Sequence, residues 1–102
     1  MSTNQNYLHS FIQFLQIEKN YSPHTIVNYE DDINEFVQFL VSENIDSLTS
    51  VQYPDVRLYL TSLYEKQFSR KTIARKISCL RSFYKFLVRE KLVVDNPFTL
   101  SS

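Results

Sequence analysis

The sequence of 102 residues contains no glycine, and it has only three prolines and one cysteine. Without glycine, tight β-hairpin turns are disfavoured, and no glycine-rich loop can be built to hold a phosphate. The single cysteine, Cys79, has no partner for an internal disulfide and no Cys or His neighbour at metal-ligand spacing. We therefore expect a helical protein, and nothing in the sequence calls for a metal or another cofactor.

Long apolar runs are missing as well. No stretch approaches the roughly 18 apolar residues that a membrane span needs, and the first residues lack a basic stretch followed by an apolar one. We expect no membrane contact, no secretion and a cytoplasmic location. The hydrophobic content of 43% suits one compact domain.

No catalytic motif is found. The two histidines, His9 and His24, have no Cys or acidic residue at ligand spacing. Three of the tyrosines, Tyr29, Tyr59 and Tyr84, lie on or beside apolar stripes and are expected in the core, with their hydroxyls as polar tips. We expect that this chain alone is not an enzyme and has no catalytic residue.

Apolar residues recur at three- and four-residue intervals, which is typical of amphipathic helices. This spacing predicts four helices, namely residues 5–18, Pro23 to about Ser42, a third from near Pro54, and Ser69 to Arg89. Ser22 and Ser69 are expected to cap their helices, and Pro23 suits a first helical position. Before Pro97 the chain should leave the helix, because the residue preceding a proline avoids helical backbone angles.

The formal net charge of zero hides a strong asymmetry. Residues 1–68 hold three basic and nine acidic residues, a net charge of −6, whereas residues 69–102 hold eight basic and two acidic residues, a net charge of +6. A protein polarised in this way suits an anionic partner that meets only one of its faces.

Basic residues of the fourth predicted helix share one face with short hydroxyl side chains. This face, the basic stripe, consists of Lys71, Arg75, Ser78, Ser82, Lys85 and Arg89. It lies roughly 160° from an apolar stripe on the same helix. Like charges along it repel by a few tenths of a kcal/mol per pair, and a polyanion would reverse that repulsion.

We predict that the basic stripe binds double-stranded DNA, most strongly through Lys71, Arg75 and Lys85. The full set of predicted DNA contacts is His24, Thr25, Asn28, Arg70, Lys71, Thr72, Arg75, Lys76, Ser78, Ser82 and Lys85. The start of the second helix is included because its free N–H groups favour a phosphate. Arg81 lies nearer the apolar side, where an internal ion pair with an acidic residue such as Asp32 is as good an interpretation as a DNA contact. A solvated basic face without a partner is the competing interpretation.

Two segments resemble the N-terminal core-binding domain of tyrosine recombinases (phage integrases), most of all the Xer type. They are Tyr21-Ser22-x-x-Thr25-x-x-x-Tyr29-x-x-Asp32-Ile33-x-x-Phe36 and Ser69-x-x-Thr72-Ile73-x-Arg75-x-Ile77-Ser78-x-Leu80-Arg81-x-Phe83-Tyr84-x-Phe86-Leu87, followed by Asn96-Pro97. The resemblance covers nearly the whole chain. One departure is Gln67-Phe68, where the family often has a glycine.

The resemblance implies an all-α, SAM-like bundle of four helices whose second and fourth helices lie toward the major groove of a recombination core site. It implies a core-binding domain at residues 1–95 and, at residues 96–102, the start of a linker to an absent catalytic domain. That domain would carry the catalytic Arg, His-x-x-Arg and Tyr set.

The function implied by the resemblance is DNA binding during DNA integration or chromosome dimer resolution. Its implied partners are double-stranded DNA, the catalytic domain of the parent chain and other recombinase protomers on the DNA. Two alternatives remain open at this point. One is a helical protein–protein interaction module, and the other is a non-catalytic regulator that occupies recombination sites without cutting them.

Overall fold

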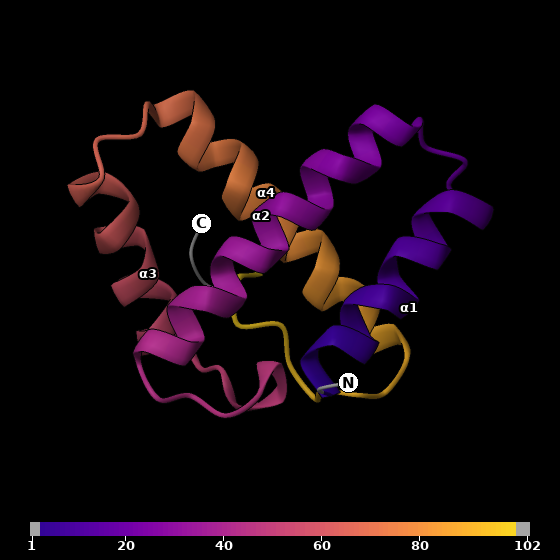
Figure 1. Ribbon diagram of the computed structural model, residues 1–102. Helices are drawn as coiled ribbons and strands as arrows, with labels where there is room; N and C mark the ends of the chain where they lie inside the picture. Colours follow the sequence, from indigo (N-terminus) through magenta and orange to yellow (C-terminus); the bar gives the residue numbers. More distant parts are fainter. Residues whose placement is uncertain (1–2, 100–102) are drawn as a thin grey trace.

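The computed structural model describes residues 3–99, which form four α-helices and one short 3-10 helix (Figure 1). The elements are α1 (Thr3–Ile17), α2 (Pro23–Ser42), η1 (Leu48–Ser50), α3 (Tyr53–Glu65) and α4 (Arg70–Arg89). No strand occurs within residues 3–99, and the predicted all-α class with four helices is confirmed. Residues 1–2 of the predicted domain and residues 100–102 of the predicted linker lie outside the described residues.

Both helices that carry the predicted DNA contacts begin at the expected serine caps. The Thr25 N–H donates to the Ser22 hydroxyl oxygen at 3.3 Å, and the Thr72 N–H donates to the Ser69 hydroxyl oxygen at 3.1 Å. These bonds satisfy backbone donors that the first turn of a helix leaves without partners. The sequence therefore fixes the starts of α2 and α4 by local chemistry.

Each helix is followed by a residue with a positive φ angle. These residues are Asn20 (54°), Asn44 (59°), Gln67 (65°) and Lys91 (61°). Glycine is the usual residue at such helix ends, because a side chain raises the energy of the left-handed conformation. Gln67 belongs to the Gln67-Phe68 pair that the sequence comparison singled out as a departure, and its backbone adopts the conformation that glycine favours.

The helices pack so that α2 crosses α4, with α1 along one side of the pair and α3 on the other (Figure 1). Aromatic rings dominate the core between them. The Phe36 ring meets the rings of Tyr59, Tyr84 and Phe98 edge-on, with centroid distances of 4.9, 6.5 and 5.5 Å. Such contacts add to the burial of large apolar surfaces and hold α3, α4 and the C-terminal segment against α2.

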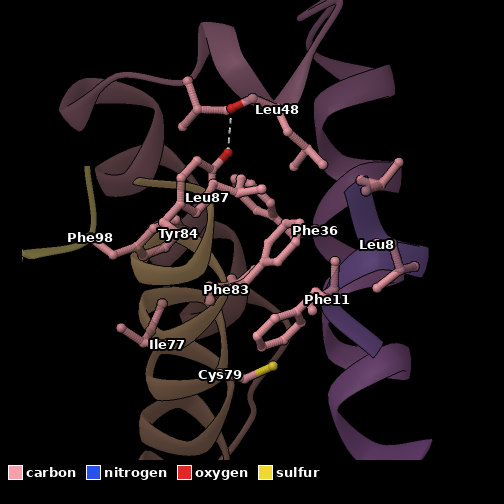
Figure 2. Packing of buried hydrophobic residues seen from close by; sticks show 14 of the residues in the cluster. Leu8, Phe11, Phe36, Leu48, Ile77, Cys79, Phe83, Tyr84, Leu87 and Phe98 are labelled. Atoms are coloured by element: carbon pink, nitrogen blue, oxygen red, sulfur yellow. Dashed lines mark hydrogen bonds between the residues drawn. The ribbon is translucent and has the colours of Figure 1, made fainter. Parts of the chain in front are cut away.

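Tyr84 and Tyr59 are fully buried, as their place beside the apolar stripes predicts, whereas Tyr29 is only partly buried. The Tyr84 hydroxyl donates to the Leu48 carbonyl at 2.6 Å, which ties η1 to α4 (Figure 2). Burial raises the pKa of Tyr84 and of Tyr59 above the ordinary value for a phenol. Phe98 also lies in the core, while the boundary at residues 95–96 stays a prediction.

Candidate nucleic-acid interface

The basic stripe lies on the exposed side of α4. Its six members are all exposed, while the apolar stripe of Ile73, Ile77, Leu80, Tyr84 and Leu87 is buried. No acidic residue occurs in the sequence of α4. One side of this helix is therefore core and the other is a surface of cations and hydroxyls.

Two lysines of the stripe keep their charges available to a ligand. Among residues 3–99, neither Lys71 nor Lys85 forms a salt bridge with a carboxylate. The same is true of Arg70, which is exposed at the first position of α4. These cations repel one another without internal compensation, and a polyanion would compensate them.

Arg75 differs from these lysines because it has a carboxylate partner. Its Nε and Nη2 atoms donate to the two carboxylate oxygens of Asp32, at 3.3 and 3.1 Å. The Arg75 side chain nevertheless remains 54% exposed, while the Asp32 side chain is 4% exposed. Arg75 is thus fixed by an internal ion pair and still accessible from outside.

The structure corrects the interpretation of Lys76, which was predicted to contact DNA. Its side chain is only 7% exposed, and its Nζ lies 3.1 Å from Asp32 Oδ1 and 2.9 Å from Glu35 Oε1. The Phe68 ring covers the ammonium group at 5.0 Å from the ring centroid. Burial would lower the pKa of Lys76, but hydrogen bonds with Glu35 and Asp32 outweigh it and raise that pKa. Lys76 is therefore part of the interior and cannot reach a ligand.

Arg81 and Asp32 do not form the ion pair that the sequence left open as an alternative. The Arg81 Nε donates instead to the Phe98 carbonyl at 3.4 Å. Asp32 faces the first turns of α4, and Arg81 lies six residues beyond Arg75, or about 9 Å farther along the helix axis. Arg81 thus holds the C-terminal segment against α4.

Two of the three predicted contacts of α2, Thr25 and Asn28, line one groove together with residues of α4. A groove of about 210 Å³ is lined by Thr25, Asn28, Tyr29, Asp32, Arg75, Ser78 and Cys79. It brings together four of the predicted residues, two from each helix. The sequence could place these residues at the start of one helix and on one stripe of another, but only the packing of α2 across α4 makes them neighbours.

Three other predicted residues stand outside this groove. His24 and Arg70 are exposed near the starts of their helices. Thr72 is partly buried, and its hydroxyl oxygen accepts a hydrogen bond from the Ser69 hydroxyl at 3.0 Å. Thr72 is thus engaged in the cap of α4 rather than offered fully to a ligand.

A second groove, of about 310 Å³, follows the C-terminal half of the stripe. Its polar lining is formed by Lys19, Tyr21, Tyr29, Ser82, Lys85 and Arg89, and aromatic and aliphatic side chains form its floor. The Arg89 guanidinium lies 4.5 Å from the Phe14 ring centroid and 3.6 Å from the Glu18 carboxylate. This groove extends the cationic face from α4 toward the end of α1.

Sequence reasoning missed Lys19. It is one of three basic residues in the acidic part of the chain and belongs to no periodic pattern. Only the packing of α1 beside α4 brings it next to Lys85 in the second groove. No signal in the sequence itself would have placed it there.

Among residues 3–99, no group of three or more His, Cys, Asp or Glu residues is placed to hold a metal ion. The Cys79 thiol is buried and donates to the Tyr29 carbonyl at 3.6 Å, and burial raises its pKa. A raised pKa keeps a thiol protonated and unreactive. Within the same range, no helix is long and apolar enough to cross a membrane.

Comparison with known proteins places these features in a family. Residues 8–91 match the family described as "Phage integrase, N-terminal SAM-like domain". The chain is 54% identical over 102 residues to tyrosine recombinase XerC of Bacillus pumilus and 54% identical over 100 residues to that of Bacillus subtilis. It is 57% identical over 95 residues to tyrosine recombinase XerC of Anoxybacillus flavithermus.

These alignments cover 100%, 98% and 93% of this chain but only 33%, 33% and 32% of the relatives. The chain therefore spans about one third of the length of the curated relatives it matches. No solved structure matches it.

Proposed function

Because the chain belongs to the phage integrase N-terminal SAM-like domain family, we propose that it is the DNA-binding module of a site-specific tyrosine recombinase. The observation that carries this proposal is the exposed basic stripe of α4, in which neither Lys71 nor Lys85 pairs with a carboxylate of residues 3–99. The similarity to tyrosine recombinases supports it independently.

The dimensions of α4 suit the major groove of a duplex. Its 20 residues extend over about 30 Å, and a major groove about 12 Å wide admits a single helix. In the proposed complex, Lys71 and Lys85 contact phosphates on either side of the groove. Thr25 and Asn28 bring the N-terminal end of α2 to the same surface.

The proposed contacts are those of the sequence prediction without Lys76, and with two additions. Lys19 and Arg89 join because they line the second groove beside Lys85. His24, Arg70, Thr72 and Ser82 stay as predicted contacts at the edges of the surface. Together they form a face that follows α4 from its first turn to its last.

Strand cleavage belongs, in this proposal, to a separate catalytic domain of the parent protein. The parent would act in DNA integration or chromosome dimer resolution in the cytoplasm, together with other recombinase protomers on paired sites. This chain would supply binding and orientation, and the catalytic domain would supply the chemistry.

Duplex binding at several salt concentrations tests the proposal. A labelled duplex of about three helical turns, roughly 30 base pairs, is long enough to cover α4. Each phosphate contact should contribute about −0.9 to the slope of log K against log salt concentration. The double variant Lys71→Ala/Lys85→Ala should bind weakly and with a shallower slope.

Two exposed residues away from the stripe serve as matched controls. Arg57→Ala removes a cation from α3, and Glu43→Ala changes the end of α2, so both variants should bind like the parent chain. If the control variants lost as much duplex-binding affinity as the double variant, the assigned DNA-binding face would be contradicted. A chain that binds no duplex at low salt would instead be a protein-interaction module.

A further inference from the structure

The Arg75–Asp32 pair uses only one edge of the guanidinium group. Nε and Nη2 donate to Asp32 Oδ2 and Oδ1, and a guanidinium has five N–H donors in a planar fork. Three donors therefore remain, namely both of Nη1 and the second of Nη2. One N–H of Nη1 and the remaining N–H of Nη2 point away from the Cδ–Nε bond, and together they form a second edge that can donate two parallel hydrogen bonds.

Asp32 itself is held rigidly. Its Oδ1 also accepts from the Lys76 ammonium at 3.1 Å, and Lys76 in turn pairs with Glu35 at 2.9 Å. Glu35 Oε1 further accepts from the Tyr59 hydroxyl at 3.2 Å. This cluster joins α2, α3 and α4, so the Asp32 carboxylate cannot turn away from Arg75 without breaking buried contacts.

The charges around Arg75 balance. Two carboxylates, Asp32 and Glu35, face two cations, Arg75 and Lys76. The groove next to them is lined by groups that donate and accept hydrogen bonds, including Asn28, Thr25 and Ser78. A balanced cluster attracts a phosphate less than Lys71 and Lys85 do, whereas a fixed set of donors and acceptors suits the edge of a base.

We propose that Asp32 is a positioning residue that fixes Arg75 for bidentate contact with the O6 and N7 atoms of one guanine in the major groove. Asn28, in the same groove, contacts an adjacent base. The inference rests on the proposed DNA-binding function and divides the interface into two parts. Lys71 and Lys85 bind phosphates without regard to sequence, and the Arg75 groove carries base preference.

Selection from a library of randomised duplexes tests this division with the full 102-residue chain. The parent chain should enrich a guanine at one position of the bound site. Replacing that guanine by another base should weaken binding by roughly 5- to 150-fold, the range for a good bidentate contact. Arg75→Ala and Arg75→Lys should both lose the preference, because lysine keeps the charge but lacks the planar fork.

Asp32→Asn tests the positioning role. It should reduce the guanine preference and should not weaken binding to unselected duplexes, because it removes a negative charge beside the exposed Arg75. It should have no further effect on the preference when Arg75 is already alanine. If Asp32→Asn does not fold, Asp32→Asn/Lys76→Met removes the buried cation that the first change leaves under-compensated. Circular dichroism and urea unfolding establish which variants are folded.

Lys85→Ala is the matched control, since it should weaken binding to all duplexes equally and keep the guanine preference. Two results would overturn the inference alone. The first is an unchanged guanine preference in Arg75→Ala. The second is a loss of binding affinity in Asp32→Asn that is equal for all duplexes and also occurs when Arg75 is already alanine. Absence of any duplex binding by the parent chain would overturn the proposed function as well.

Discussion

The two halves of α4 carry the same kinds of residue, yet the fold treats them differently. In the first half, Arg75 and Lys76 are paired with carboxylates of α2, and one of the two is buried. In the second half, Lys85 has no salt bridge within residues 3–99. Within the same range, the carboxylates that pair with Arg89 are those of the exposed residues Glu18 and Glu90.

The difference shows that a count of cations does not measure the charge available to a ligand. Buried pairs are held by geometry and are destabilising to break, whereas exposed pairs contribute little and exchange readily with other anions. The turn of α4 that carries Arg75 and Lys76 is therefore suited to hold a fixed arrangement, whereas Lys71 at the start of the helix and Lys85 in its second half are suited to attract a polyanion.

The largest expected effect comes from breaking the buried cluster. Lys76→Ala leaves Asp32 and Glu35 without their shared cation, and it should lower the free energy of unfolding by about 3–5 kcal/mol. Urea denaturation followed by circular dichroism measures the change. Lys71→Ala, a change at an exposed lysine five residues earlier, should alter the free energy of unfolding by less than about 0.5 kcal/mol. A loss below about 1 kcal/mol for Lys76→Ala would show that the cluster does not hold the first half of α4.

High pH should weaken the same cluster. Folding raises the pKa of Lys76, because its bonds to Glu35 and Asp32 outweigh burial, and it raises the pKa of Tyr59 through burial. A raised pKa adds stability below the unfolded-state pKa, near 10, and that stability is lost as pH rises through the folded-state pKa. Each group should therefore contribute a fall of at most about 1.4 kcal/mol per pH unit, confined to the range between about pH 10 and its folded-state pKa. Urea midpoints from pH 8 upward measure it, and a shallower alkaline fall is expected in Lys76→Met.

Prediction from sequence worked where the chemistry is local. The starts of α2 and α4 follow from Ser22 and Ser69, and the exposure of the basic stripe follows from helical periodicity. The burial of Lys76 could also have been predicted from periodicity. It lies three residues after Ile73 and four before Leu80, on the buried side of the helix.

The ion pairs could not be predicted in the same way. Asp32 is separated from Arg75 by 43 residues, and its choice of Arg75 and Lys76 over Arg81 depends on where α2 crosses α4. The second groove has the same origin, since Lys19 and Lys85 line it together only through the packing of α1 beside α4. Contacts between distant segments set the parts of the site that periodicity leaves open.

A moderate change in stability is expected at the two residues with positive φ angles that flank α4. Gln67 and Lys91 flank the helix and adopt φ angles of 65° and 61°. Glycine relieves the strain of a side chain in this conformation, so Gln67→Gly and Lys91→Gly should each raise the free energy of unfolding by about 1 kcal/mol. Thermal or urea unfolding measures both. Destabilisation by either change would show that the side chain contributes more than its backbone strain.

The smallest expected effect on stability concerns the exposed pair of the second half. Glu18→Ala removes a carboxylate 3.6 Å from the Arg89 guanidinium, and stability should change by less than about 0.5 kcal/mol. Duplex binding should become slightly tighter, because Glu90 is then the one carboxylate within residues 3–99 that still competes with the DNA for Arg89. Fluorescence anisotropy with the same duplex checks this, and weaker binding would argue against Arg89 as a contact.

The comparison of the two halves is tested most directly by the salt dependence of duplex binding in Lys85→Ala and Arg75→Ala. Lys85→Ala should make the slope of log K against log salt concentration less negative by about 0.9, the value for one phosphate contact. Arg75→Ala should weaken binding to the selected duplex while leaving the slope nearly unchanged. A parent-like slope in Lys85→Ala would contradict the assignment of the basic stripe to the DNA backbone.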